Sequence, residues 1–276
     1  MRYSSNHVLR SFLLFLSIAL MVFGAPKSQA DEKSPAEAAF VQTMLNGEVT
    51  CPGEYGGHQQ GMATDRKTAI FWSHTVALAK TDLTGKLLKV IDVPTHSGDL
   101  AYHDGKVYVA TNLGDFNREG GKRDSWIYVY NAEDLALLDK HPVNDVEFGA
   151  GGIAYHEGRF IIIGGLPTEY EENYVYEYDE NFTFLKRYVL PTGHTNVGIQ
   201  SAAYHNGYWW FGCYGEKGLV QVDESFKLVK MYGLNFAWGI IGLEGDTLMQ
   251  GGEWGSMKAT RLKPSDVWKR NTSDNE

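Results

Sequence analysis

Two histidines, His58 and His96, occupy equivalent positions in two similar stretches of the sequence. Each stands four residues before an apolar residue, Met62 or Leu100, at which the two stretches align. Imidazole nitrogens transfer protons near neutral pH and also bind zinc and other first-row metal ions. Three roles are therefore open for the pair: ligands of one divalent ion (zinc or calcium), general acid–base catalysis, or hydrogen bonds to water and loop carbonyls. Asp99, close to His96, is expected to orient the imidazole or to take part in catalysis.

Other polar and aromatic residues stand where they are expected to lie near these histidines. Imidazole, amide and indole side chains suit a pocket for a small molecule. The predicted ligand-binding residues are Gln60, His74, Asn112, His194, Gln200 and Trp254. The chain has no Gly-x-Ser-x-Gly elbow, no His-Glu-x-x-His motif and no phosphate-binding glycine loop, so no standard motif defines a reaction.

The elements that must position these residues follow a repeat. Five stretches share an apolar strand, and most of them end in a glycine turn: 57–65, 95–103, 149–156, 198–205 and 236–243. Their aligned apolar residues are separated by 38, 53, 49 and 38 residues. Such lengths, with strands rich in aromatic and β-branched residues, predict an all-β fold, a β-propeller of five four-stranded blades. Six blades remain an alternative. We expect a strand near residues 48–51 to complete the last blade and close the ring.

The topology of a propeller divides the polar residues between two faces. The loop that leads into the first strand of a blade lies at one end of the central channel, and the turn after that strand lies at the other. His103, His156 and His205 all fall in such turns, each two residues before a glycine, which indicates a structural role. His58 and His96 precede the first strands, so they are predicted to meet at the opposite end, the channel mouth.

The N-terminal segment has the pattern of an export signal. Residues 12–23 are almost wholly apolar, basic residues precede them, and Ser28 and Ala30 occupy the positions that a signal peptidase reads. We expect cleavage after Ala30 and a secreted or periplasmic protein, with an uncleaved anchor as the alternative. The predicted domains are a signal peptide (1–30), a helix and linker (31–46), one propeller (47–270) and a tail (271–276).

The charge of the chain limits its partners. The formal net charge is −9, and it becomes −12 without the leader, which contains Arg2, Arg10 and Lys27. An acidic protein is a poor match for nucleic acid and for an anionic membrane surface, so we expect neither as a partner. We expect a monomer that binds a small molecule. Cys51 and Cys213 leave one possible disulfide, which the sequence does not decide.

The order of these pieces resembles the secreted five-bladed propellers of the plant- and bacterial-type glutaminyl cyclases (glutamine cyclotransferases). Residues 59–61 (Gln-Gln-Gly) are similar to an element that opens their first blade. Residues 78–86 are similar to their third strand and its turn, and residues 98–100 (Gly-Asp-Leu) to a further short element. The resemblance implies an exported propeller and, as one option, transfer of a glutaminyl acyl group.

Three functions remain open at this level. The first is an enzyme of the hydrolase or lyase type that acts on a small extracellular sugar, lactone or peptide-like substrate, with or without a divalent metal ion. The second is a propeller that binds a ligand or a protein without catalysis. The third is the cyclotransferase-like acyl transferase.

Overall fold

The computed structural model describes Met1 and residues 35–269. The chain divides into two units, Met1–Glu32 and Lys33–Glu276, and the second contains all the described helices and strands. The predicted signal peptide and the predicted C-terminal tail lie outside the described residues. Helix α1 (Pro35–Leu45) precedes the strands, as the sequence predicts for this region, and packs Phe40 and Met44 into the fold.

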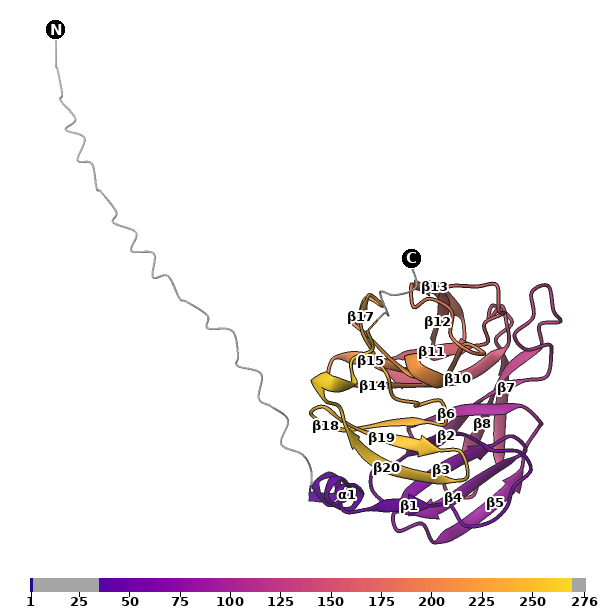
Figure 1. The fold of residues 1–276 in the computed structure, drawn as a ribbon, viewed down its shortest axis with the longest axis vertical. Coiled ribbons are helices and arrows are strands. Elements are labelled where there is room, and N and C mark those ends of the chain that lie inside the picture. Colours follow the sequence, from indigo (N-terminus) through magenta and orange to yellow (C-terminus); the bar gives the residue numbers. More distant parts are fainter. Residues whose placement is uncertain (2–34, 270–276) are drawn as a thin grey trace. The chain divides into compact units, whose positions relative to one another are not determined.

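The described strands form five antiparallel sheets of four strands each (Figure 1). The first contains β2 (Gln59–Thr64), β3 (Ala69–His74), β4 (Ala77–Asp82) and β5 (Leu87–Asp92). The second contains β6 (Ser97–His103), β7 (Lys106–Asn112), β8 (Ser125–Asn131) and β9 (Leu137–Pro142). The third contains β10 (Ala150–His156), β11 (Arg159–Gly164), β12 (Asn173–Asp179) and β13 (Phe184–Leu190). The fourth contains β14 (Ile199–His205), β15 (Tyr208–Cys213), β16 (Leu219–Val222) and β17 (Leu228–Tyr232). The fifth contains β18 (Ile240–Glu244), β19 (Thr247–Gly252), β20 (Ser256–Arg261) and β1 (Glu48–Thr50). Two 3-10 turns, Gly215–Lys217 and Pro264–Asp266, complete the elements.

The five sheets are the blades of a β-propeller. The innermost strands contact one another in the order β2, β6, β10, β14 and β18, and β18 contacts β2 again. The prediction of five blades is therefore confirmed, and the six-bladed alternative is wrong. The last blade is completed from the other end of the chain, because β1 pairs with β20 and Val49 lies opposite Met257. The predicted closing strand is confirmed.

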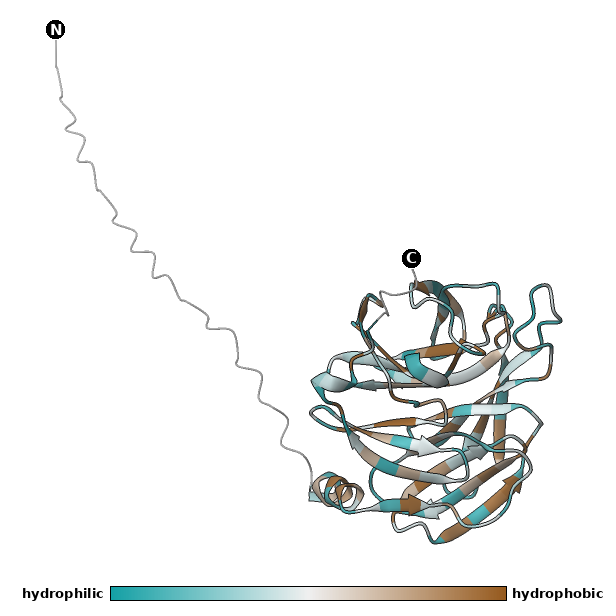
Figure 2. Ribbon diagram, viewed as in Figure 1, coloured by the Kyte–Doolittle hydropathy of each residue, from teal (hydrophilic) through white to brown (hydrophobic). Residues whose placement is uncertain are grey.

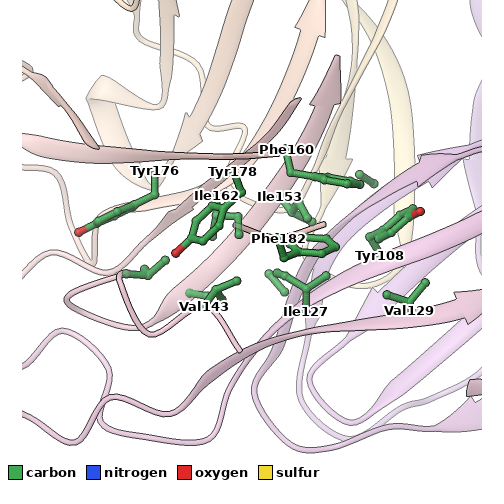
Figure 3. Packing of buried hydrophobic residues seen from close by; sticks show 14 residues of the cluster. Tyr108, Ile127, Val129, Val143, Ile153, Phe160, Ile162, Tyr176, Tyr178 and Phe182 are labelled. Carbon is green, nitrogen blue, oxygen red and sulfur yellow. The ribbon is translucent and has the colours of Figure 1, made fainter. Parts of the chain in front are cut away.

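Burial falls from the inner strands to the outer ones. Every residue of β3 is buried, whereas the outermost strand β5 is almost wholly exposed. Hydrophobic residues occur on inner and outer strands alike (Figure 2), and those of the outer strand β5, such as Leu88, are exposed. Neighbouring blades share these cores: Ile127 and Val129 of the second blade pack with Ile153 and Ile162 of the third (Figure 3). Since each blade buries its face against the next, the repeat positions the channel mouth rigidly.

The hairpin histidines join blades together at the end of the channel opposite the mouth. The His103 ring stacks on Tyr155 of the following blade, with 3.7 Å between ring centroids. His156 stacks on Tyr204 in the same way, at 3.3 Å. His205 contacts the backbone oxygen of Gly245 through Nε2 at 3.0 Å. These contacts give the three histidines the structural role that their turn positions indicate.

Cys51 and Cys213 are both buried and free, so no disulfide joins them. Among the described residues, no helix has the length and apolar character needed to cross a membrane.

Candidate functional site

An axial cavity of about 190 Å³ lies at the mouth of the channel. It brings together five of the residues singled out from the sequence: His58, Gln60, His96, Asn112 and Gln200. They come from three blades, and all but Asn112 lie at or just before the start of an innermost strand. The equivalence of positions in the repeat is the reason that residues far apart in the sequence converge here.

β-Bulges turn residues of the innermost strands toward the cavity. The pairing of β2 with β3 shifts between Gln59 and Gly61, which leaves Gln60 as the extra residue. The same shift in β14 leaves Gln200 as the extra residue. Bulges in β6 and β10 place the glycines Gly98 and Gly151 at the cavity wall. A bulge changes the direction of a side chain. The first and fourth blades therefore each turn an amide toward the cavity, whereas the second and third blades have glycine there and leave the space open.

Gln60 fixes the orientation of His58. Its Nε2 lies 3.2 Å from His58 Nε2 and donates to Thr75 Oγ1, also at 3.2 Å. An amide nitrogen only donates, so His58 Nε2 accepts in this contact and the proton of the neutral ring is on Nδ1. Both N–H groups of Gln60 are thereby engaged, and its function here is to position the imidazole.

His96 is exposed and lies in the left-handed backbone region, with φ of 57°. Val197, another lining residue, has φ of 54°. Positive φ is costly for residues other than glycine, and for a β-branched residue it is a genuine outlier. Such strain tends to collect at functional sites, and here three residues with positive φ line one cavity, since Asn117 has φ of 58°. Asparagine adopts this region at little cost, so the strain falls on His96 and Val197. No hydrogen bond to the His96 ring is found among residues 35–269, so its nitrogens are available to a ligand.

Two amides retain a donor for a ligand. Asn112 Nδ2 donates to Gly114 O at 3.1 Å, and Asn112 Oδ1 accepts from Ser125 Oγ at 3.1 Å. Gln200 Nε2 donates to Val197 O at 2.6 Å. Each amide nitrogen carries two N–H groups, so one remains on each after these bonds.

The remaining wall of the cavity is largely apolar, and the sequence-based prediction missed it. Phe116, Val197 and Tyr214 contribute to it, and no aspartate, glutamate, lysine or arginine lines the cavity. Burial raises the pKa of Tyr214, and so does the nearby charge of Glu253, so its hydroxyl stays neutral. Tyr214 directly follows β15, and Phe116 and Asn117 lie in the loop after β7, so these lining residues all follow the second strand of a blade.

Asp99 does not line the cavity, although the sequence groups it with His96. It is 1% exposed, and its Oδ2 accepts a hydrogen bond from Ala202 N–H at 2.9 Å across the channel. A Cβ at Gly61 would collide with its carboxylate, so Asp99 fills the centre of the ring behind the mouth. Burial raises the pKa of Asp99 well above its usual range, although the N–H groups of Ala202, Leu100 and Met62 favour the ionised form.

The other predicted residues lie elsewhere. His74 and Trp254 line a second cavity, which shares His58 with the axial cavity. His194 lines neither of them: its Nδ1 lies 3.0 Å from Tyr170 O, and its N–H donates to Glu171 at 3.0 Å.

The axial cavity has fewer imidazole and carboxylate side chains than zinc sites usually use. It offers two imidazoles and amide oxygens, and the described residues contain no group of three or more histidine, cysteine, aspartate or glutamate side chains placed to hold an ion. Structural zinc sites use four protein ligands and catalytic sites use three. The predicted zinc or calcium ion remains a prediction, and no step below depends on it.

No family model matches the chain, and no curated protein matches it either. Solved structures do. The glutaminyl cyclase of Myxococcus xanthus superposes with a TM-score of 0.58 at 13% identity, over 82% of this chain and 97% of that one. A protein of unknown function from Bacteroides caccae superposes with a TM-score of 0.50 at 17% identity, over 78% and 86%. At these identities the likeness establishes the fold, and the chain is a five-bladed β-propeller that resembles a bacterial glutaminyl cyclase in structure.

Proposed function

We propose that the protein is an enzyme that binds a small, uncharged polar molecule in the axial cavity and removes a proton from it. The observation that carries this proposal is the convergence of two imidazoles and four side-chain amides in a cavity with no aspartate, glutamate, lysine or arginine. Neutral hydrogen-bonding groups suit the hydroxyl, carbonyl or amide groups of a sugar, a lactone or a peptide-like substrate.

The two imidazoles have different roles. His96, whose ring nitrogens are available, is the general base. His58 is fixed by Gln60 as a hydrogen-bond donor through Nδ1. The free N–H groups of Asn112 and Gln200 hydrogen-bond a substrate oxygen and stabilise the negative charge that develops on it. The reaction class is hydrolysis or elimination, in which proton removal activates water or the substrate.

A glutaminyl cyclotransferase is the second candidate, and the structural likeness to the Myxococcus xanthus enzyme favours it. In this reaction the amine of an N-terminal glutamine attacks its own side-chain amide carbon, a proton leaves the amine, and ammonia is released. His96 would accept that proton and return it to the side-chain amide nitrogen, which then leaves as ammonia. We further propose that the protein acts outside the cytoplasm after cleavage following Ala30. N-terminal sequencing of exported protein tests this, with Asp31 expected as the first residue.

Turnover of a substrate panel tests the proposal: sugar lactones, neutral glycosides, and peptides that begin with glutamine, the last followed by ammonia release. His96→Ala should lower kcat about 100-fold or more, because general base catalysis contributes at least that factor. His141→Ala, in the outer strand β9, is the matched control and should keep full activity. Turnover at the wild-type rate in His96→Ala would overturn the role of His96.

Metal analysis of the purified protein, with His58→Ala as the control, tests the predicted ion separately.

A further inference from the structure

A second cavity of about 450 Å³ lies beside the first, between the first and last blades. The loop before β2, the start of β2, the end of β3 and the turn between β19 and β20 line it. The side chains that matter here are those of Glu54, Tyr55, Gln59, His74, Glu253 and Trp254. This cavity has a different chemical character from the axial one.

Two buried polar atoms of its lining residues lack a hydrogen-bond partner within the described structure: Gln59 Oε1 and His74 Nε2. Gln59 is 0% exposed, and its Nε2 donates to Trp238 O at 2.7 Å, so the amide cannot rotate to engage its oxygen without losing that bond. His74 is 4% exposed. Burial lowers the pKa of His74 to about 4, as does the nearby His58, so the ring stays neutral and one nitrogen can accept. Unpaired buried polar atoms are rare in folded proteins, and a ligand is one explanation for them.

The charges and rings at this cavity select a cation. Two carboxylates line it, Glu54 and Glu253, and no lysine or arginine does. Trp254 is 75% exposed, although a large apolar ring normally packs away from water. Tyr55 presents a second ring, with its centroid 4.5 Å from that of His74. Aromatic faces and carboxylates together attract cations, and a planar cation can also stack on indole.

We propose that this second cavity binds a guanidinium group, as on arginine. Gln59 Oε1, His74 Nε2 and the carboxylates of Glu54 and Glu253 provide four acceptor groups. A guanidinium has five N–H donors in one plane, whereas an ammonium has three. Its flat face also matches the exposed indole of Trp254. The site is distinct from the proposed catalytic groups except for the shared residue His58, so it does not rest on the proposed reaction.

Isothermal titration with N-acetyl-arginine amide tests the proposal. The citrulline analogue has nearly the same shape without the charge, and the lysine analogue has the charge without the plane. We expect saturable binding of the arginine compound and at least about tenfold weaker binding of the other two. An arginine-containing peptide in a parallel titration distinguishes a peptide from a small molecule as the source of the group.

Surface variants keep the test independent of folding. Trp254→Ala and Glu253→Gln replace exposed side chains, and each should weaken binding about tenfold. Glu133→Gln, an exposed carboxylate in the turn after β8, is the matched control and should bind as wild type does. Gln200→Ala, which alters the axial cavity, should also keep arginine binding. Equal binding of the citrulline analogue, absence of saturable binding, or wild-type affinity in both Trp254→Ala and Glu253→Gln would overturn the proposal.

Discussion

The buried carboxylate at the centre of the ring allows a sharp test by two substitutions at one position. Asp99→Ala removes the acceptor of the Ala202 N–H and leaves the nearby Leu100 and Met62 N–H groups less well satisfied. A buried donor without a partner costs about 1–3 kcal/mol. With one donor fully orphaned and two affected in part, we expect a loss of about 3 kcal/mol in the free energy of unfolding. Asp99→Asn keeps an oxygen in place and resembles the protonated carboxyl group, so it should lie within about 1 kcal/mol of wild type near pH 4.

The pH dependence of the same pair tests the ionisation of Asp99. Its pKa is raised in the folded protein, so the native state binds the proton more tightly than the unfolded chain does. The stabilisation from this group is therefore complete below its unfolded pKa of about 3.9 and is lost as the pH rises toward the folded pKa. The stability of wild type relative to Asp99→Asn should fall across that interval, by up to about 1.4 kcal/mol per pH unit.

Urea unfolding followed by tryptophan fluorescence, from pH 4 to pH 8, measures both quantities, since the chain has seven tryptophans. Parallel stability profiles for wild type and Asp99→Asn would show that Asp99 has an ordinary pKa in the folded protein. Equal stability of the alanine and asparagine variants would refute the argument from backbone donors.

Three further predictions concern the scaffold. Burial lowers the pKa of His156, so the neutral imidazole stabilises the fold above about pH 6.5. This contribution declines as the pH falls below that value. The melting temperature of His156→Phe should therefore depend less on acid pH than that of wild type. Gly242→Ala would press a methyl group against the ring of His205 and should cost about 1–3 kcal/mol in chemical unfolding, whereas Gly47→Ala, where a methyl group meets open space, should have little effect. Burial raises the pKa of Cys213 to about 12, so at pH 8 this thiol should resist a thiol-specific disulfide reagent in the folded protein. It should react once urea unfolds the protein. Rapid labelling of Cys213 in the folded protein would contradict its burial.

The five-bladed fold could be predicted from the sequence because each blade buries the same faces. Similar residues therefore recur at similar intervals along the chain. The closing strand near Val49 could be predicted on the same ground, since the last blade lacked a strand. The site was less predictable. A bulge separates Gln59 from Gln60 and sends these neighbours to different cavities, and no residue type at either position marks that irregularity.

Asp99 shows a second limit of sequence patterns. The spacing places it near His96, but whether a side chain at the start of an innermost strand points to the mouth or across the axis depends on the same local irregularity. The shape of the second cavity depends on contact between the first and last blades, which involves residues as distant as Tyr55 and Trp254. Such contacts follow from ring closure rather than from any local pattern.

The pairing of β1 with β20 has a consequence for how the chain is made. Strand β1 leaves the ribosome before the first four blades, and its partner is among the last segments to follow. The first four blades have all their strands before translation ends, whereas the fifth must wait for both ends of the chain. A product truncated before Ser256 would therefore carry four complete blades and a fifth with only β18 and β19, and β1 would have no partner. Such a product would expose the edge of β19, on which other chains can add strands, so premature termination would yield an aggregating species rather than a smaller propeller.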